Sequence, residues 1–153
     1  MRGLLLAALL VTFGADRAEA QTIQAQRTAV VRGIHDCDTI AVTVELGFGV
    51  LFETGVRVYG VAAPEVTGAE APKGLACRDR AIGRWLKIGD RVGLDLVKRD
   101  KYGRALAAIR LPSGEDLASA LIAGGWALHY GGIGPMPRWP AAEPYPLTKE
   151  TIP

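Results

Sequence analysis

Five short segments rich in Val, Ile and Thr, separated by turn residues, constrain the fold of this chain more than any other feature. They lie at residues 27–34, 38–46, 50–61, 91–98 and 104–111. β-Branched residues favour strands, and the Gly, Asp and Pro residues between the segments are typical of turns. We therefore predict five β-strands, of which the first two form a hairpin.

Two further segments have helical periodicity. Residues 75–88 place apolar side chains at the spacings of an amphipathic helix, namely at Ala81, Ile82, Trp85 and Leu86. Residues 116–123 form a shorter helical segment, which a Gly pair ends. The Gly- and Pro-containing stretch 67–74 is predicted to be a mobile loop. The residues alone thus indicate a small, mainly β protein with two helices, of the α+β class.

The first twenty residues have the pattern of a signal peptide. Arg2 provides a positive start, residues 4–13 an apolar core, and Ala18-Glu19-Ala20 a cleavage pattern. The apolar run is shorter than the roughly 20 residues that a membrane helix needs, so no stable membrane span is expected. We predict cleavage after Ala20 and a secreted or periplasmic protein.

The rest of the chain is near neutral and has the length of one domain. The net charge is +2 and does not change when residues 1–20 are removed. Residues 131–153 contain a Gly pair and six prolines, which predicts a flexible tail. Trp139 and Tyr145 either dock this tail onto the barrel, form a motif that binds a partner, or have no specific role. No extended apolar interface is evident, and we predict a monomer.

Three short polar segments stand out in this apolar chain. The first is Asp-Cys-Asp-Thr at 36–39, the second is Arg57 followed by Ala-Pro-Glu at 63–65, and the third is Asp-Lys-Tyr-Gly-Arg at 100–104. Carboxylates can hold a hard cation and manage an attacking water, and guanidinium groups suit phosphate. Together the segments predict one site for phosphodiester hydrolysis.

In order and spacing, these segments resemble the staphylococcal nuclease-like (thermonuclease) family over residues 27–130. The motifs are DCDT, RVYGVAAPE (57–65), DKYGR and LIAGGWA (121–127). The resemblance implies a five-stranded OB-fold barrel with one helix after strand 3 and a short helix after strand 5. It also implies a Ca²⁺-dependent endonuclease whose substrate is DNA or RNA.

The resemblance assigns a role to each matching residue. Asp38 is implied to bind Ca²⁺ directly, Ala63 through its backbone carbonyl, and Glu65 through a water. Glu65 is also implied to orient or deprotonate the attacking water. Arg57 and Arg104 are implied to clamp the scissile phosphate and to stabilise its negative charge.

Four residues have secondary roles by the same resemblance. Asp36 orders the first turn, and Thr39 contributes through water or by capping that turn. Lys101 and Tyr102 lie near the terminal phosphate or base of the substrate.

The chain departs from the family pattern at two positions. Ala62 stands where the family usually has an Asp ligand for calcium, and Cys37 replaces a turn glycine. Cys37 and Cys77 either form a disulfide, which would tie the first acidic turn to the helix after Glu65, or are two buried thiols. Two functions therefore stay open: a secreted calcium-dependent nuclease, or a catalytically impaired OB-fold module that binds nucleic acid or another anionic ligand.

Overall fold

The computed structural model describes residues 27–100 and 102–139. The predicted signal peptide, Lys101 and the end of the tail with Tyr145 lie outside the described residues.

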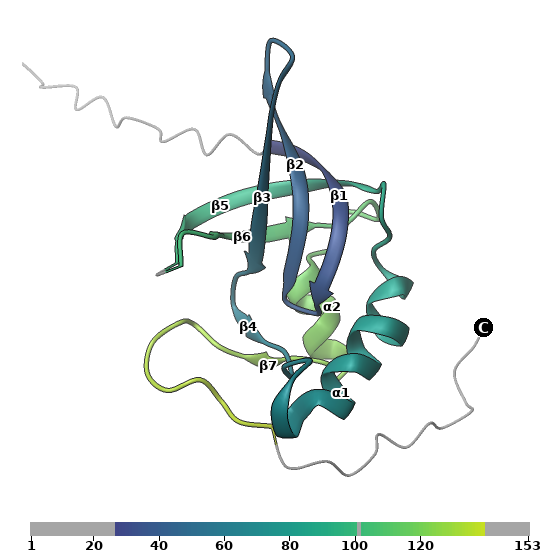
Figure 1. The fold of residues 1–153 in the computed structure, drawn as a ribbon, viewed down its shortest axis with the longest axis vertical. Helices are drawn as coiled ribbons and strands as arrows, with labels where there is room; N and C mark the ends of the chain where they lie inside the picture. The colour runs from purple at the N-terminus through teal and green to yellow at the C-terminus, as the bar shows by residue number, and fades with distance from the viewer. Residues whose placement is uncertain (1–26, 101, 140–153) are drawn as a thin grey trace, which may run out of the picture.

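The strands close into a barrel (Figure 1). The barrel strands are β1 (Arg27–Asp36), β2 (Thr39–Gly47), β3 (Val50–Val58), β5 (Arg91–Arg99) and β6 (Ala105–Arg110), hydrogen-bonded in the order β1-β2-β3-β6-β5. Every pair is antiparallel except β3 and β6, which run parallel. The predicted five-stranded α+β barrel is confirmed, and this architecture is compatible with an OB-fold.

The third predicted strand is shorter than expected. It ends at Val58, because Gly60 adopts a φ of +86° and turns the chain. Val61–Ala62 then form a separate strand, β4, which pairs antiparallel with β7 (Leu128–His129). This small second sheet was not predicted, and it holds the 63–65 segment close to the end of the barrel.

The first helical region starts earlier than predicted and ends at Arg84 rather than at residue 88, and the expectation of a loop at 67–74 was wrong. A 3₁₀ turn at Gly68–Glu70 leads into α1 (Ala71–Ala76), followed by a π-helical turn at Cys77–Ala81 and a 3₁₀ turn at Ile82–Arg84. Pro72 lies in the first turn of α1, where a helix tolerates proline. A side chain at Gly74 would collide with the carbonyl of Glu65, so α1 packs directly on the segment that carries Glu65.

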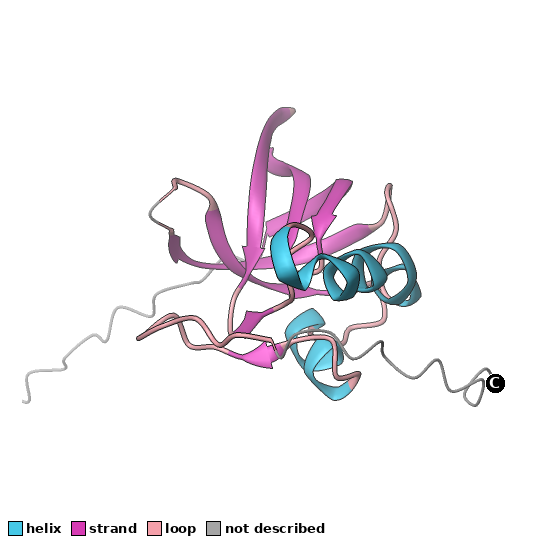
Figure 2. Cartoon of the chain, turned by 60° about the horizontal axis from the view of Figure 1, so that its bottom comes forward, coloured by secondary structure: helices cyan, strands magenta, loops and turns pink. Residues whose placement is uncertain are grey.

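The second helix, α2 (Leu117–Ala123), agrees with the prediction to within one residue. Asp116 caps it by accepting a hydrogen bond from the backbone N–H of Ser119 at 2.9 Å. Figures 1 and 2 show α1 and α2 at the end of the barrel away from the tip of the β2–β3 hairpin. No helix in the described part of the chain is long and apolar enough to cross a membrane.

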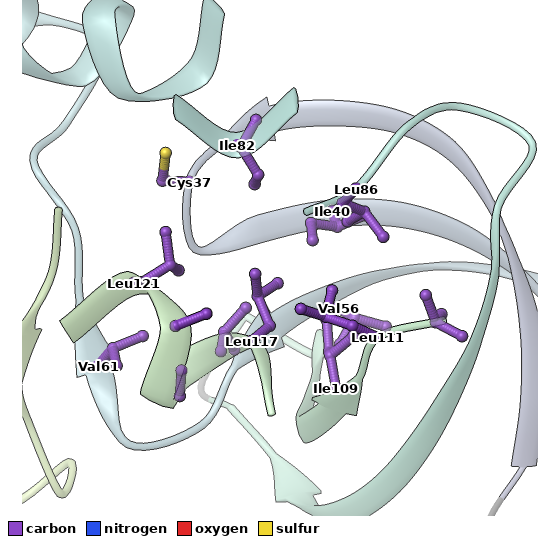
Figure 3. Close-up of a cluster of buried hydrophobic side chains, with 14 of the residues drawn as sticks. Cys37, Ile40, Val56, Val61, Ile82, Leu86, Ile109, Leu111, Leu117 and Leu121 are labelled. Carbon is purple, nitrogen blue, oxygen red and sulfur yellow. The ribbon is translucent and has the colours of Figure 1, made fainter. Parts of the chain in front are cut away.

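The core fills the barrel and continues beneath it. Ile40, Val56 and Ile109 from the barrel are fully buried, and Leu117 and Leu121 of α2 belong to the same cluster, which Figure 3 shows. Apolar side chains of the helical region, Ile82 and Leu86, pack onto the same cluster. Trp85 and Trp126 pack against this core, and Trp85 belongs to the predicted apolar face of the first helical segment. The core thereby fixes both helices relative to the β1–β2 turn.

Cys37 and Cys77 form a disulfide with a Cα–Cα distance of 6.0 Å, a normal separation for this bond. Both residues are fully buried. The bond joins the β1–β2 turn to the π-helical turn, as expected for the paired alternative. The cross-linked segment contains Asp38, Arg57 and Glu65, so the bond connects all three to one covalent loop.

Candidate active site

The three polar segments meet at one cleft of about 600 Å³. The predicted residues that line it are Asp36, Arg57, Glu65, Tyr102 and Arg104. Three other predicted residues, Asp38, Thr39 and Ala63, are buried and do not line the cleft. The sequence therefore predicted which segments converge, while the structure adds which side chains are accessible there.

Asp38 is the buried centre of this region and is 2% exposed. Its Oδ1 accepts hydrogen bonds from Arg57 Nη1 at 2.9 Å and from Thr39 Oγ1 at 3.2 Å, and its Oδ2 accepts one from the backbone N–H of Ala63 at 2.8 Å. The Asp38 backbone carbonyl accepts from the Val58 N–H. One carboxylate thus fixes the β1–β2 turn, the end of β3 and the segment leading to Glu65.

Asp36 stabilises the same turn. Its Oδ1 accepts a hydrogen bond from the backbone N–H of Asp38 at 3.0 Å, the pattern of an Asx turn. The contact matches the ordering role that the resemblance implies for Asp36. Asp36 is 6% exposed and also lines the cleft.

Burial raises the pKa of Asp38 to about 7, with Arg57 opposing this shift and Asp36 adding to it. A raised native pKa means that the native state holds the proton more tightly than the unfolded chain does, where the pKa is near 3.8. The resulting stability is complete below pH 3.8 and is lost as the pH rises to about 7.

We expect the unfolding free energy to fall over this pH window, by up to about 1.4 kcal/mol per pH unit for this one group. The check is urea unfolding at several pH values for the wild type and for Asp38→Asn, which cannot titrate. The unfolding free energy of wild type relative to that of Asp38→Asn should fall steadily from pH 4 to 7. A pH-independent difference would contradict the assignment.

One nitrogen of the Arg57 guanidinium has no hydrogen-bond partner within the described residues. Its Nη1 bonds Asp38, whereas its Nη2 is buried and has no partner within the described residues. The side chain is only 12% exposed and lies at the cleft. A buried donor without an acceptor costs about 1–3 kcal/mol, so this position favours an anionic ligand such as a phosphate oxygen.

Arg104 is held by its own turn. Its Nε donates to Asp100 Oδ2 at 2.7 Å, and its guanidinium lies 5.5 Å from the centre of the Tyr102 ring. Asp100 Oδ1 accepts the backbone N–H groups of Tyr102 and Arg104, both at 2.9 Å. Sequence reasoning assigned no role to Asp100, although a first Asp in a Gly-containing turn is a known turn signal.

Glu65 presents an exposed carboxylate to the same cleft. Its backbone N–H donates to Glu70 Oε2 at 3.1 Å, and Glu70 Oε1 accepts the backbone N–H of Trp139 at 3.2 Å. Glu70 therefore fixes Glu65 from one side and the tail from the other. No sequence signal indicates a role for Glu70, because Trp139 lies 69 positions away and the contact with Glu65, five positions away, belongs to none of the motifs.

The described start of the tail folds back toward the helical region rather than away from the domain. Trp139 lies against Lys73, whose Nζ is 5.7 Å from the ring centre, and Met136 lines the cleft beside Glu65. Of the roles that the sequence left open for Trp139, this contact matches docking. The tail thereby narrows one side of the cleft.

The residues present do not complete a calcium site. Within the described residues, no three His, Cys, Asp or Glu side chains gather where they could hold a metal ion. Both oxygens of Asp38 already accept hydrogen bonds, from Arg57, Thr39 and Ala63. Ca²⁺ takes 6–8 oxygen ligands, so this donor set is too small, and we assign no step to a metal ion.

Ala62→Asp should supply the missing carboxylate but should also destabilise the fold. Ala62 is 1% exposed within β4, where an unpaired charge costs several kcal/mol. We expect the variant to melt at a lower temperature than wild type without calcium, and to recover part of the loss when calcium is added. Calorimetric titration should show calcium binding at least about tenfold tighter than in wild type, since affinity follows ligand charge. A melting temperature of Ala62→Asp that is the same with and without calcium would refute this expectation.

A scan against protein-family models found no match, and a search of curated proteins found none either.

Proposed function

We propose that this chain is a secreted nuclease that hydrolyses phosphodiester bonds of DNA or RNA at the cleft of Arg57, Glu65 and Arg104. The observation that carries the proposal is the buried Nη2 of Arg57, which has no partner within the described residues, at a cleft that Arg104 and the exposed Glu65 also line. Guanidinium groups bind phosphate oxygens through paired donors, and a carboxylate beside them can act as a general base.

Each residue has a defined task in this proposal. Arg57 and Arg104 bind the non-bridging oxygens and stabilise the charge that grows as water attacks phosphorus. Glu65 accepts the proton of that water, the bond from phosphorus to the leaving oxygen breaks, and the leaving oxygen takes a proton from solvent water. Asp38 acts indirectly, because its bond to Nη1 sets the direction in which Nη2 of Arg57 points.

The resemblance to the thermonuclease family supports the same roles for Arg57, Glu65 and Arg104. It also makes Ca²⁺ the expected cofactor, although the donor set described above falls short of that ion. Secretion is proposed from the signal-peptide pattern, and the disulfide supports it, because such bonds persist mainly in oxidising compartments. We also propose that the protein is a monomer.

A second function has its own support. An OB-fold module that binds nucleic acid or another anion, without cleaving it, would use the same two arginines. The incomplete set of calcium ligands around Asp38 favours this reading. Cleavage distinguishes the two functions, because the binding module would bind a nucleic-acid strand without cutting it.

The test compares arginine variants of residues 21–153 on single-stranded DNA. Arg57→Ala should lower cleavage by about 10²–10³, as loss of a charge-stabilising donor does. Arg57→Lys keeps a positive charge beside Asp38 but loses the planar fork, and it should also be impaired.

Arg91→Ala is the matched control, because Arg91 is 66% exposed and pairs with Glu45 away from the cleft. Fluorescence anisotropy on the same DNA measures binding alongside cleavage. Binding that depends on Arg57 without any cleavage by the parent would replace the nuclease with the binding module. Equal cleavage by Arg57→Ala and Arg91→Ala would refute the site.

A further inference from the structure

A second concavity, of about 340 Å³, lies at the end of the barrel that the β2–β3 hairpin overhangs. Its walls are apolar, and several of its side chains are accessible: Leu46 is 45%, Phe52 43% and Leu96 56% exposed. The buried side chains of Val44 and Val56 lie deeper in the same concavity. We call this concavity the barrel groove. An accessible aromatic ring above an apolar floor is an unusual surface for a protein in water.

The barrel groove adjoins the cleft. Arg99 lines both, and Ala105 in the groove directly follows Arg104 in the cleft. The aliphatic part of Arg104 also passes Gly55 of β3, 3.9 Å from where a Cβ would stand. A ligand bound at Arg104 therefore needs to extend only past Arg99 to enter the groove.

Positive charge accompanies the apolar surface. Arg27 and Arg99 both line the barrel groove. Arg99 donates one hydrogen bond, from Nη1 to the Gly103 carbonyl, and Arg27 has no ion pair in the described part of the chain. Guanidinium groups beside an apolar slot with an aromatic ring match a nucleotide, which joins an anionic backbone to a flat base.

We propose that the barrel groove binds a base of the same strand whose phosphate lies on Arg57 and Arg104, with Phe52 as the stacking residue. The inference rests on the proposed function for its ligand class, but not on cleavage. The arginines and the continuity with the cleft favour a nucleic-acid strand over an apolar peptide or a lipid, which need neither. The base must be unpaired to enter, so single strands bind more tightly than duplex.

The experiment measures binding of fluorescein-labelled single-stranded DNA by anisotropy, with calcium chelated to suppress cleavage. One probe is a dinucleotide and the other is about twelve nucleotides long, within the usual range for one OB-fold. Phe52→Ala should weaken binding of the long probe by about tenfold or more, and should leave the dinucleotide unaffected. Phe52→Leu, which keeps the groove apolar and filled, guards against loss of folding and should show an intermediate effect.

Phe48→Ala is the matched control. Phe48 is on the same hairpin and is fully exposed, but it does not line the groove. We expect Phe48→Ala to bind both probes with the affinity of wild type. Equal losses in Phe48→Ala and Phe52→Ala, or no loss in either, would overturn the proposal.

The experiment can refute the proposal for the barrel groove and the proposal of nuclease activity separately. Phe52-dependent binding of the long probe by a protein that never cleaves DNA would leave the groove standing and refute the nuclease. Cleavage by the parent with no effect of Phe52 or of strand length would refute the groove and leave the nuclease.

Discussion

Glu65→Gln should lower the rate of phosphodiester hydrolysis by about 10²–10⁴, the range typical for a lost general base. Gln keeps the size of the side chain but cannot accept the proton of the attacking water. The carboxylate is exposed, and the hydrogen bond that fixes residue 65 comes from its backbone N–H, so the fold should be unaffected. Initial rates on single-stranded DNA measure the effect.

Glu53→Gln is the matched control for this variant. Glu53 is also exposed, but it lies on β3 away from the cleft. It should cleave at the wild-type rate, and both variants should melt at the wild-type temperature. A Glu65→Gln protein as fast as Glu53→Gln would remove Glu65 from the mechanism.

Loss of the disulfide should have the largest effect on stability. The bond joins residues 40 positions apart, and closing a loop of that length stabilises a protein by about 4 kcal/mol in the chain-entropy description. We expect Cys37→Ala/Cys77→Ala to lose about 2–4 kcal/mol of unfolding free energy and to melt about 10 °C lower. Urea and thermal unfolding measure both.

Reductant provides the control for the disulfide. It should destabilise the wild type toward the level of the double variant and should leave the double variant unchanged. Cys37 lies between Asp36 and Asp38, so we also expect binding at the cleft to weaken when the bond is lost. A double variant as stable as wild type would mean that packing alone fixes the β1–β2 turn.

Local signals were sufficient for the elements of the barrel, since strand propensity and turn residues are properties of short segments. Barrel closure came from the family resemblance, and the structure bears it out. The pairing of β4 with β7 joins residues far apart in sequence, and two-residue strands have no periodicity to detect. The helix at 71–76 was missed because Pro and Gly were taken as loop signals. There, Pro72 occupies a permitted first turn, and Gly74 is required by close packing on Glu65.

The candidate site could likewise be predicted only in part from the sequence. Motif order predicted that Arg57, Glu65 and Arg104 would share one cleft, and they do. The supporting contacts of Glu70 have no sequence signal, because Trp139 lies 69 positions away and the short-range contact with Glu65 belongs to none of the motifs. The burial of Asp38, with Arg57 and Ala63 bonded to its carboxylate, follows from the packing of three segments and has no local signature.

The most direct test of the central claim is a cleavage assay on purified residues 21–153 with single-stranded DNA in a calcium-containing buffer. If the cleft of Arg57, Glu65 and Arg104 hydrolyses phosphodiesters, shorter fragments will accumulate with time in proportion to the protein concentration. A folded protein that leaves the DNA intact at every concentration would contradict the nuclease and would favour the binding module.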